Sequence, residues 1–131
     1  MNLQRIFNVV AFAAAVLLTG PVFAGPNDYA FEPVPAEIKQ GNGVTVGVRL
    51  VHKPTGKPVP DAVITRSRID MAPDGMASMD SPLTAIPAKE PGVYAFKTDL
   101  TMAGRWQLSV SARVQGEPQP VAGKVVVKAV K

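Results

Sequence analysis

The chain has 131 residues, the length of one domain, and its 14 basic and 10 acidic residues give a net charge of +4. The basic residues are scattered singly and are not interleaved with aromatic residues, which argues against a nucleic-acid-binding surface. Because there is no cysteine and only one histidine, disulfides are excluded, as is a tetrahedral zinc site of nitrogen and sulfur ligands within one chain.

The N-terminal segment, residues 1–24, has the pattern of a secretory signal peptide. Arg5 supplies a positive charge, residues 9–18 form a short apolar run, and a Gly-Pro breaker precedes Ala24, after which we expect cleavage. The apolar run is too short to span a bilayer comfortably. We therefore expect residues 25–131 to form one soluble domain in a bacterial periplasm. The alternative, an uncleaved signal, would leave this domain attached to the membrane.

Four segments of the remaining chain alternate apolar and polar residues, which is the period of a half-buried strand. They are residues 44–52, 92–100, 104–114 and 123–130. A fifth predicted strand, residues 61–71, has a mixed pattern in which Val63, Ile69 and Met71 are in phase.

The apolar faces of the four alternating segments supply the predicted core, with Trp106 as its expected anchor. The inward residues are predicted to be Val44, Val46, Val48, Leu50, Tyr94, Phe96, Leu100, Trp106, Leu108, Val110, Ala112, Val114, Val125, Val127 and Ala129. Pro and Gly occur in every interval between the strands, and no segment after residue 25 has helical periodicity over three turns. This pattern predicts an all-β fold, an antiparallel β-sandwich of immunoglobulin-like type.

The sequence contains no recognisable catalytic arrangement. A serine nucleophile would need His52 as its base, and no G-x-S-x-G motif is present. We therefore expect neither enzymatic activity nor an organic cofactor. Asp70, Asp74 and Gly75 follow the order of a calcium-binding loop, but alanine and serine occupy two of its ligand positions. These acidic residues are predicted to form a turn instead.

Three methionines, Met71, Met76 and Met79, occur in the segment "MAPDGMASMD", whose Pro73 and Gly75 predict irregular structure. Each methionine alone is expected to fill the core, a common use of its flexible side chain. Together, in an exported chain without cysteine, they form a candidate soft-metal site. Thioether sulfur is neutral and prefers Cu(I), or Ag(I) as a surrogate, to Zn(II) or Ca(II).

Two further residues are candidates for the same site. Met102, in "TMAGRW", is in phase with the predicted inward residues of 92–100 and is expected to lie beside the methionine segment. His52 ends its strand in phase with the buried face and would supply an imidazole ligand or cap the core. Trp106 would shield such a site or fill the core.

The stretches "GKPVPDAVI", "MAPDGMASM" and "EPGVYAFKTDLTMAGRWQLSVSARV" resemble the YtkA-like domain, also grouped as FixH-like, over roughly residues 40–130. The resemblance implies an exported or membrane-anchored immunoglobulin-like domain associated with heavy-metal efflux and copper handling, and in the FixH branch with assembly of a copper-containing oxidase. The expected cleavable signal departs from the longer transmembrane helix of that branch. The family's Met-rich segment and its M-x-G-x-W turn match Met71, Met76, Met79, Met102, Gly104 and Trp106.

Two hypotheses about function follow. The first is a periplasmic Cu(I)-binding buffer or carrier that passes the ion to an efflux or delivery protein. The second is a metal-free envelope interaction module that uses the Met-rich segment as an apolar docking patch. Metal binding predicts that the sulfur atoms converge, whereas docking predicts that they spread over the surface.

Overall fold

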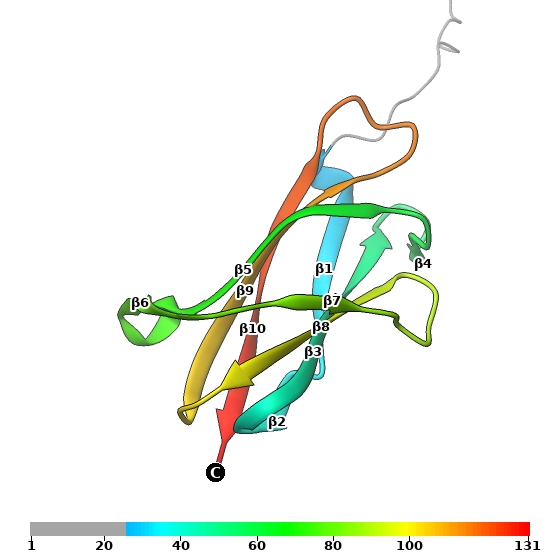
Figure 1. Cartoon of the computed structure of the whole chain (residues 1–131). Coiled ribbons are helices and arrows are strands. Elements are labelled where there is room, and N and C mark those ends of the chain that lie inside the picture. The colour runs from blue at the N-terminus through cyan, green and yellow to red at the C-terminus, as the bar shows by residue number, and fades with distance from the viewer. Residues whose placement is uncertain (1–25) are drawn as a thin grey trace, which may run out of the picture.

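The computed structural model describes residues 26–131, which form two five-stranded sheets packed face to face (Figure 1). This arrangement confirms the predicted immunoglobulin-like β-sandwich. The predicted signal peptide, residues 1–24, lies outside the described residues. Within 26–131, no helix has the length and apolar character needed to cross a membrane.

The first sheet, sheet A, has the order β1-β3-β8-β7, with β4 also paired to β3. Its strands are β1 (Tyr29–Val34), β3 (Gly41–His52), β4 (Lys57–Pro58), β7 (Thr84–Ile86) and β8 (Val93–Leu100). The second, sheet B, has the order β2-β10-β9-β5-β6. Its strands are β2 (Glu37–Lys39), β5 (Val63–Met71), β6 (Met76–Ser81), β9 (Gly104–Arg113) and β10 (Val121–Val130). Two 3-10 turns, η2 (Pro26–Asp28) and η3 (Ala72–Asp74), precede β1 and β6.

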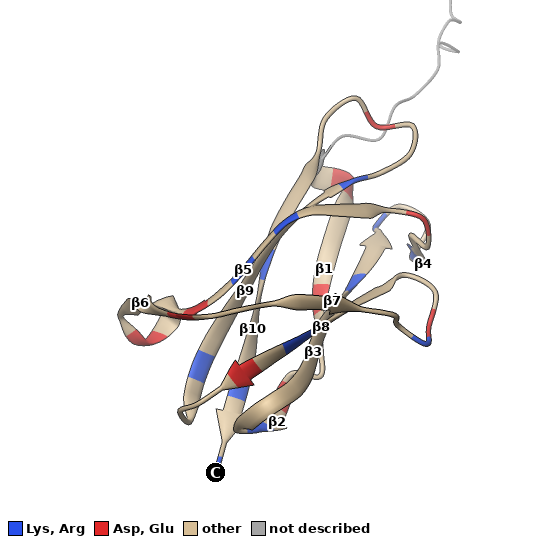
Figure 2. Ribbon diagram, in the orientation of Figure 1, with Lys and Arg blue, Asp and Glu red and all other residues tan. Residues whose placement is uncertain are grey.

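The core lies between the sheets, where the predicted alternation places it. On β9 the residues Trp106, Leu108, Val110 and Ala112 are buried, and the polar residues between them face outward. Trp106 is 1% exposed, as expected of the core anchor. Figure 2 shows acidic and basic residues on both sheets and their loops, without division of the molecule into an acidic and a basic half.

The predicted inward position of Val63 on β5 is wrong, because this side chain is 62% exposed. The register between β5 and β9 shifts between Ile64 and Arg66. A bulge adds one residue to a strand and so reverses the direction of every side chain on its far side. Ile64 packs against the core in place of Val63.

The methionine segment is also more regular than its Pro and Gly predict. Pro73 lies within η3, and Gly75 ends that turn with a left-handed φ of 77°, so both lie in the connection between β5 and β6. The methionines themselves lie in strands. After β6 the chain leaves sheet B, and following Pro82 and Leu83 it enters sheet A as β7.

Candidate functional site

The β5–β6 hairpin brings Met71 and Met76 together. Met71 is the last residue of β5, Met76 is the first of β6, and the two are directly paired across the hairpin. Side chains paired in this way project from the same face of a sheet, with their Cβ atoms about 5 Å apart. Met71 is fully buried, so the face that it shares with Met76 is the inner face of sheet B.

Met79 reaches the same apolar cluster from an irregular part of β6. The register passes from Asp70 opposite Asp80 to Met71 opposite Met76, which leaves residues 77–79 without direct partners on β5. Met76 and Met79 are half-buried, and both pack against the core cluster that contains Met71. All three predicted methionines therefore contact one apolar cluster.

Met102 lies in the turn between β8 and β9, next to this cluster. Its side chain is 40% exposed, and its carbonyl oxygen accepts a hydrogen bond from Trp106 Nε1 at 3.1 Å. Gly104 follows two residues later, and a Cβ atom built on it would lie 2.6 Å from Met71 Cε. The turn that carries Met102 is thus in contact with the end of the Met71 side chain.

His52 lies at the other end of the sandwich. On β3, Gly41 is opposite Leu100 near the β8–β9 turn, whereas His52 ends the strand eleven residues later. At about 3.3 Å per residue, this separates His52 from that turn by about 35 Å along the strand. His52 Nδ1 lies 2.9 Å from Thr55 Oγ1, and its ring lies 5.3 Å from that of Tyr29. The structure therefore does not bring His52 to the methionines.

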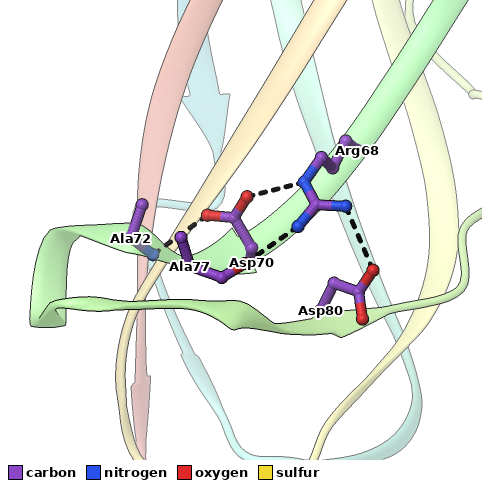
Figure 3. A network of polar contacts seen from close by, with 5 residues as sticks. All are labelled: Arg68, Asp70, Ala72, Ala77 and Asp80. Carbon is purple, nitrogen blue, oxygen red and sulfur yellow. Dashed lines mark hydrogen bonds and ion pairs between the residues drawn. The ribbon is translucent and has the colours of Figure 1, made fainter.

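Arg68 joins the two strands of the hairpin (Figure 3). Its Nε donates to Asp70 Oδ2 at 2.8 Å, one terminal nitrogen donates to Asp80 Oδ2 at 3.1 Å, and the other donates to the carbonyl oxygen of Ala77 at 2.8 Å. The hydrogen bond to Asp70 is the main reason that the pKa of Arg68 is raised. The other oxygen of Asp70 accepts from Ala72 N at 2.9 Å, which begins the turn at η3.

A second polar contact fastens the tip of the hairpin to β9. Asp74 Oδ2 accepts from Arg105 N, and Asp74 Oδ1 accepts from Arg105 Nε, each at 2.8 Å. Another nitrogen of this guanidinium donates to the carbonyl oxygen of Pro73 at 2.7 Å. The backbone hydrogen bond, followed by the side-chain one, lowers the pKa of the Asp74 carboxyl. The turn predicted at Asp74 and Gly75 is confirmed.

Sequence reasoning missed Arg68 and Arg105 as supports of the hairpin. The acidic residues that they bind, at positions 70, 74 and 80, were visible only as turn formers. Nothing in an alternating strand pattern shows which outward cation lies opposite which acid, because this depends on the strand order β6-β5-β9. The only sequence feature that could have indicated these contacts was the placement of three acidic residues around the methionines.

The arrangement offers thioether sulfur as its donor chemistry. No group of three or more His, Cys, Asp or Glu side chains is placed to hold a metal ion within residues 26–131. The carboxylates of the hairpin, at positions 70, 74 and 80, are hydrogen-bonded to Arg68 or Arg105. Polarisable, uncharged sulfur suits Cu(I) and Ag(I), so the residues present fit an ion of that kind.

Comparison with protein families matches the YtkA-like model to residues 23–111. Among solved structures, the chain is similar to the Lin-41 filamin domain, at 17% identity and a TM-score of 0.43 over 72% of this chain and 83% of that one. It is also similar to the ZirS C-terminal domain, at 11% identity and a TM-score of 0.43 over 94% of this chain and 87% of that one. A search of curated proteins found no match. Because the family match extends over more than half of its length, the chain belongs to the YtkA-like family.

Proposed function

We propose that this protein is exported to the periplasm, where it binds Cu(I) as cargo and passes it to an efflux or delivery protein. Met71, Met76 and Met79 would hold the ion, with Met102 beside them. The observation that supports the proposal is the gathering of these methionines at one end of the sandwich, on and around a single apolar cluster.

The exposure of the methionines supports a carrier that releases its ion. Met71 is fully buried, Met76 and Met79 are half-buried, and Met102 is 40% exposed. In transfer between thioether sites, the ion exchanges its ligands one at a time. A set of sulfur atoms that ranges from buried to exposed therefore suits transfer of the ion to a partner protein. His52 takes no part in this proposal, because it lies at the far end of β3.

The same exposures count against the alternative, a metal-free interaction module. A docking patch requires contiguous exposed apolar surface. Among the described residues, the exposed large apolar side chains are Val63, Met102 and Val126, so only one of the four methionines is among them. Because the methionines mostly face inward, their arrangement favours the binding of one ion by several sulfur atoms over the docking of a partner on an exposed patch.

The test is a Cu(I) titration of the chain without residues 1–24, in competition with a colorimetric chelator. This form retains every residue of the two core clusters described within residues 26–131. Methionine methyl groups labelled with carbon-13 would show which side chains respond. We expect stoichiometric binding, with shifts of the Met71, Met76 and Met79 signals and a smaller shift for Met102.

The double variant Met76→Leu, Met79→Leu is expected to bind Cu(I) at least about tenfold more weakly, because leucine keeps the bulk and removes the sulfur. Leu83→Met is the matched control, since Leu83 packs against the same cluster and the change removes no thioether. Absence of binding by the parent, or equal loss in the double variant and the control, would refute a methionine site.

A further inference from the structure

The outer face of sheet B carries a group of basic residues at the end away from the methionine hairpin. Ser109 on β9 is paired with Arg68 on one side and with Lys124 on the other, and Ser111 is paired with Arg66. These serines alternate with the buried residues of β9, so they and their partners face outward.

Three of the cations on this face have no acidic partner. Arg66, Arg113 and Lys124 are exposed and take part in none of the ion pairs found within residues 26–131. The two acids that the methionine hairpin places on this face, Asp70 and Asp80, are both bound to Arg68. Figure 2 shows basic residues, in blue, along β5 and β9. Within the described part of the chain, ion pairs therefore do not neutralise the positive charge of these three side chains.

Hydroxyl groups and a shallow hollow lie between these cations. A shallow cleft of about 560 Å³, open to solvent, lies over the paired strands β5 and β9, and Arg66, Arg68, Ser109 and Ser111 are among the residues that line it. Serine hydroxyls both donate and accept hydrogen bonds, and guanidinium groups bind carboxylates in a two-point geometry. The cleft thus presents donors suited to carboxylate groups.

Two exposed apolar side chains border the basic group. Val63, 62% exposed, is paired with Arg113, and Val126, 43% exposed, is paired with Gln107. They are two of the three large apolar side chains that the described residues expose. Apolar contacts beside arginine are typical of protein–protein interfaces. Binding to a membrane surface would instead call for aromatic side chains beside the cations.

We propose that the outer face of sheet B, centred on Arg66, Arg113 and Lys124, docks an acidic segment of another protein. Carboxylates of the partner would bind the three cations and the serine hydroxyls, and its apolar atoms would cover Val63 or Val126. Complementary charge would speed the encounter and make it sensitive to salt. This proposal does not depend on metal binding, because it involves none of the methionines.

The experiment uses poly-L-glutamate as the probe of an acidic segment, with binding followed by amide NMR and calorimetry at low and at physiological salt. We expect the largest shifts at Ser109, Ser111 and Arg66. The variant Arg66→Glu, Arg113→Glu, Lys124→Glu is expected to bind at least about tenfold more weakly. The matched control, Lys57→Glu, Lys89→Glu, Lys97→Glu, makes the same change in charge at exposed lysines of sheet A or its β7–β8 loop, and should retain binding.

Four outcomes would overturn the proposal. Equal weakening in both triple variants would mean that only the net charge matters. Shifts on sheet A instead of sheet B would place the interaction elsewhere, and absence of binding at low salt would rule it out. A vesicle of anionic and neutral phospholipids is tested in parallel, and tighter binding to the vesicle than to polyglutamate would assign the face to a membrane. The Cu(I) titration is repeated on both triple variants, so failure of one proposal is separable from failure of the other.

Discussion

The carboxylate of Asp74 accepts hydrogen bonds from the backbone nitrogen and from Nε of Arg105, each at 2.8 Å. Asp74 lies at the tip of the methionine hairpin, and Arg105 lies near the start of β9. This contact and the Arg68 network hold the hairpin at two points. The methionines are therefore presented by an ordered element of sheet B.

The Asp74 contact makes the stability of the domain depend on pH in the acidic range. Its pKa in the folded protein is below the ordinary value of 3.8, because the Arg105 hydrogen bonds favour the ionised form. Below that value the unfolded chain binds a proton that the folded chain does not, so stability falls as pH falls through the folded pKa. Thermal unfolding between pH 5 and pH 2 should therefore show a steeper loss for the parent than for Asp74→Asn. An equal loss of stability with falling pH in the parent and in Asp74→Asn would mean that the Asp74–Arg105 contact does not stabilise the domain in solution.

Both tyrosines are predicted to ionise above the ordinary tyrosine pKa of 10.0. Burial, followed by a hydrogen bond to Glu117, raises the pKa of Tyr29 to about 12, and burial raises that of Tyr94. Ultraviolet titration should show both tyrosines ionising at higher pH in the folded protein than in denaturant, where both titrate near pH 10. The stability that Tyr29 contributes is complete below pH 10 and is lost as pH rises through about 12.

The variant Glu117→Ala is the control for the tyrosine titration. It removes the acceptor that lies 2.8 Å from the Tyr29 hydroxyl. One of the two ionisations should then move toward pH 10 while the other stays in place. If both move, Glu117 acts through the whole fold instead of through this hydrogen bond.

Arg68→Met is predicted to destabilise the domain more than Arg66→Met, because it leaves the buried carboxylate of Asp70 without its cation. Asp70 is 6% exposed, and it accepts hydrogen bonds from Arg68 Nε and from Ala72 N. Only the hydrogen bond from Ala72 N would remain in the variant. Arg66→Met, two residues earlier on the same strand, removes an exposed cation without an ion pair and should stay within about 0.5 kcal/mol of the parent. Urea denaturation of the two variants measures the difference. Equal effects would show that the network adds no stability.

Met71→Ala is predicted to cost about 2–5 kcal/mol, because the side chain is fully buried and its removal opens a cavity. Met71→Leu keeps the volume and should cost less than about 1.5 kcal/mol. Met102→Ala, at a side chain 40% exposed, should have an effect below about 1 kcal/mol. The free energy of unfolding of the three variants tests this order. A Met71→Ala variant as stable as Met102→Ala would contradict the packing described here.

The main strands were predictable from sequence because one face of each is buried. Trp106, Leu108 and Val110 on β9 follow the period of two that burial imposes, and the same is true of Val46 and Val48 on β3. The prediction was wrong at Val63, because a bulge leaves no mark in the apolar pattern. Strands β1, β2, β4, β6 and β7 were not predicted. β1 contains Pro33, and β2, β4 and β7 have only two or three residues each, whereas β6 follows the turn at Pro73 and Gly75.

The candidate site was predictable in its composition but not in its geometry. The clustering of Met71, Met76 and Met79 in ten residues was enough to single out the segment. That Met102 lies beside this segment, whereas His52 lies at the far end of β3, depends on strand order and length. The pairing of distant strands is a property of the whole fold. A local pattern can therefore place His52 in phase with the core residues of its strand, but it cannot show at which end of the sandwich His52 lies.

The passage of the chain from sheet B to sheet A after β6 joins the methionine hairpin to the opposite side of the sandwich. Ser81 Oγ donates to the carbonyl oxygen of Asp99 at 2.6 Å, and Thr98 Oγ1 donates to that of Pro82 at 2.7 Å. Separation of β6 from β5 would therefore strain these bonds to β8 as well. On the proposal that Met71 holds an ion, transient opening of this edge would admit it, and amide hydrogen exchange along β6, whose pairing with β5 would break, reports how often the edge opens.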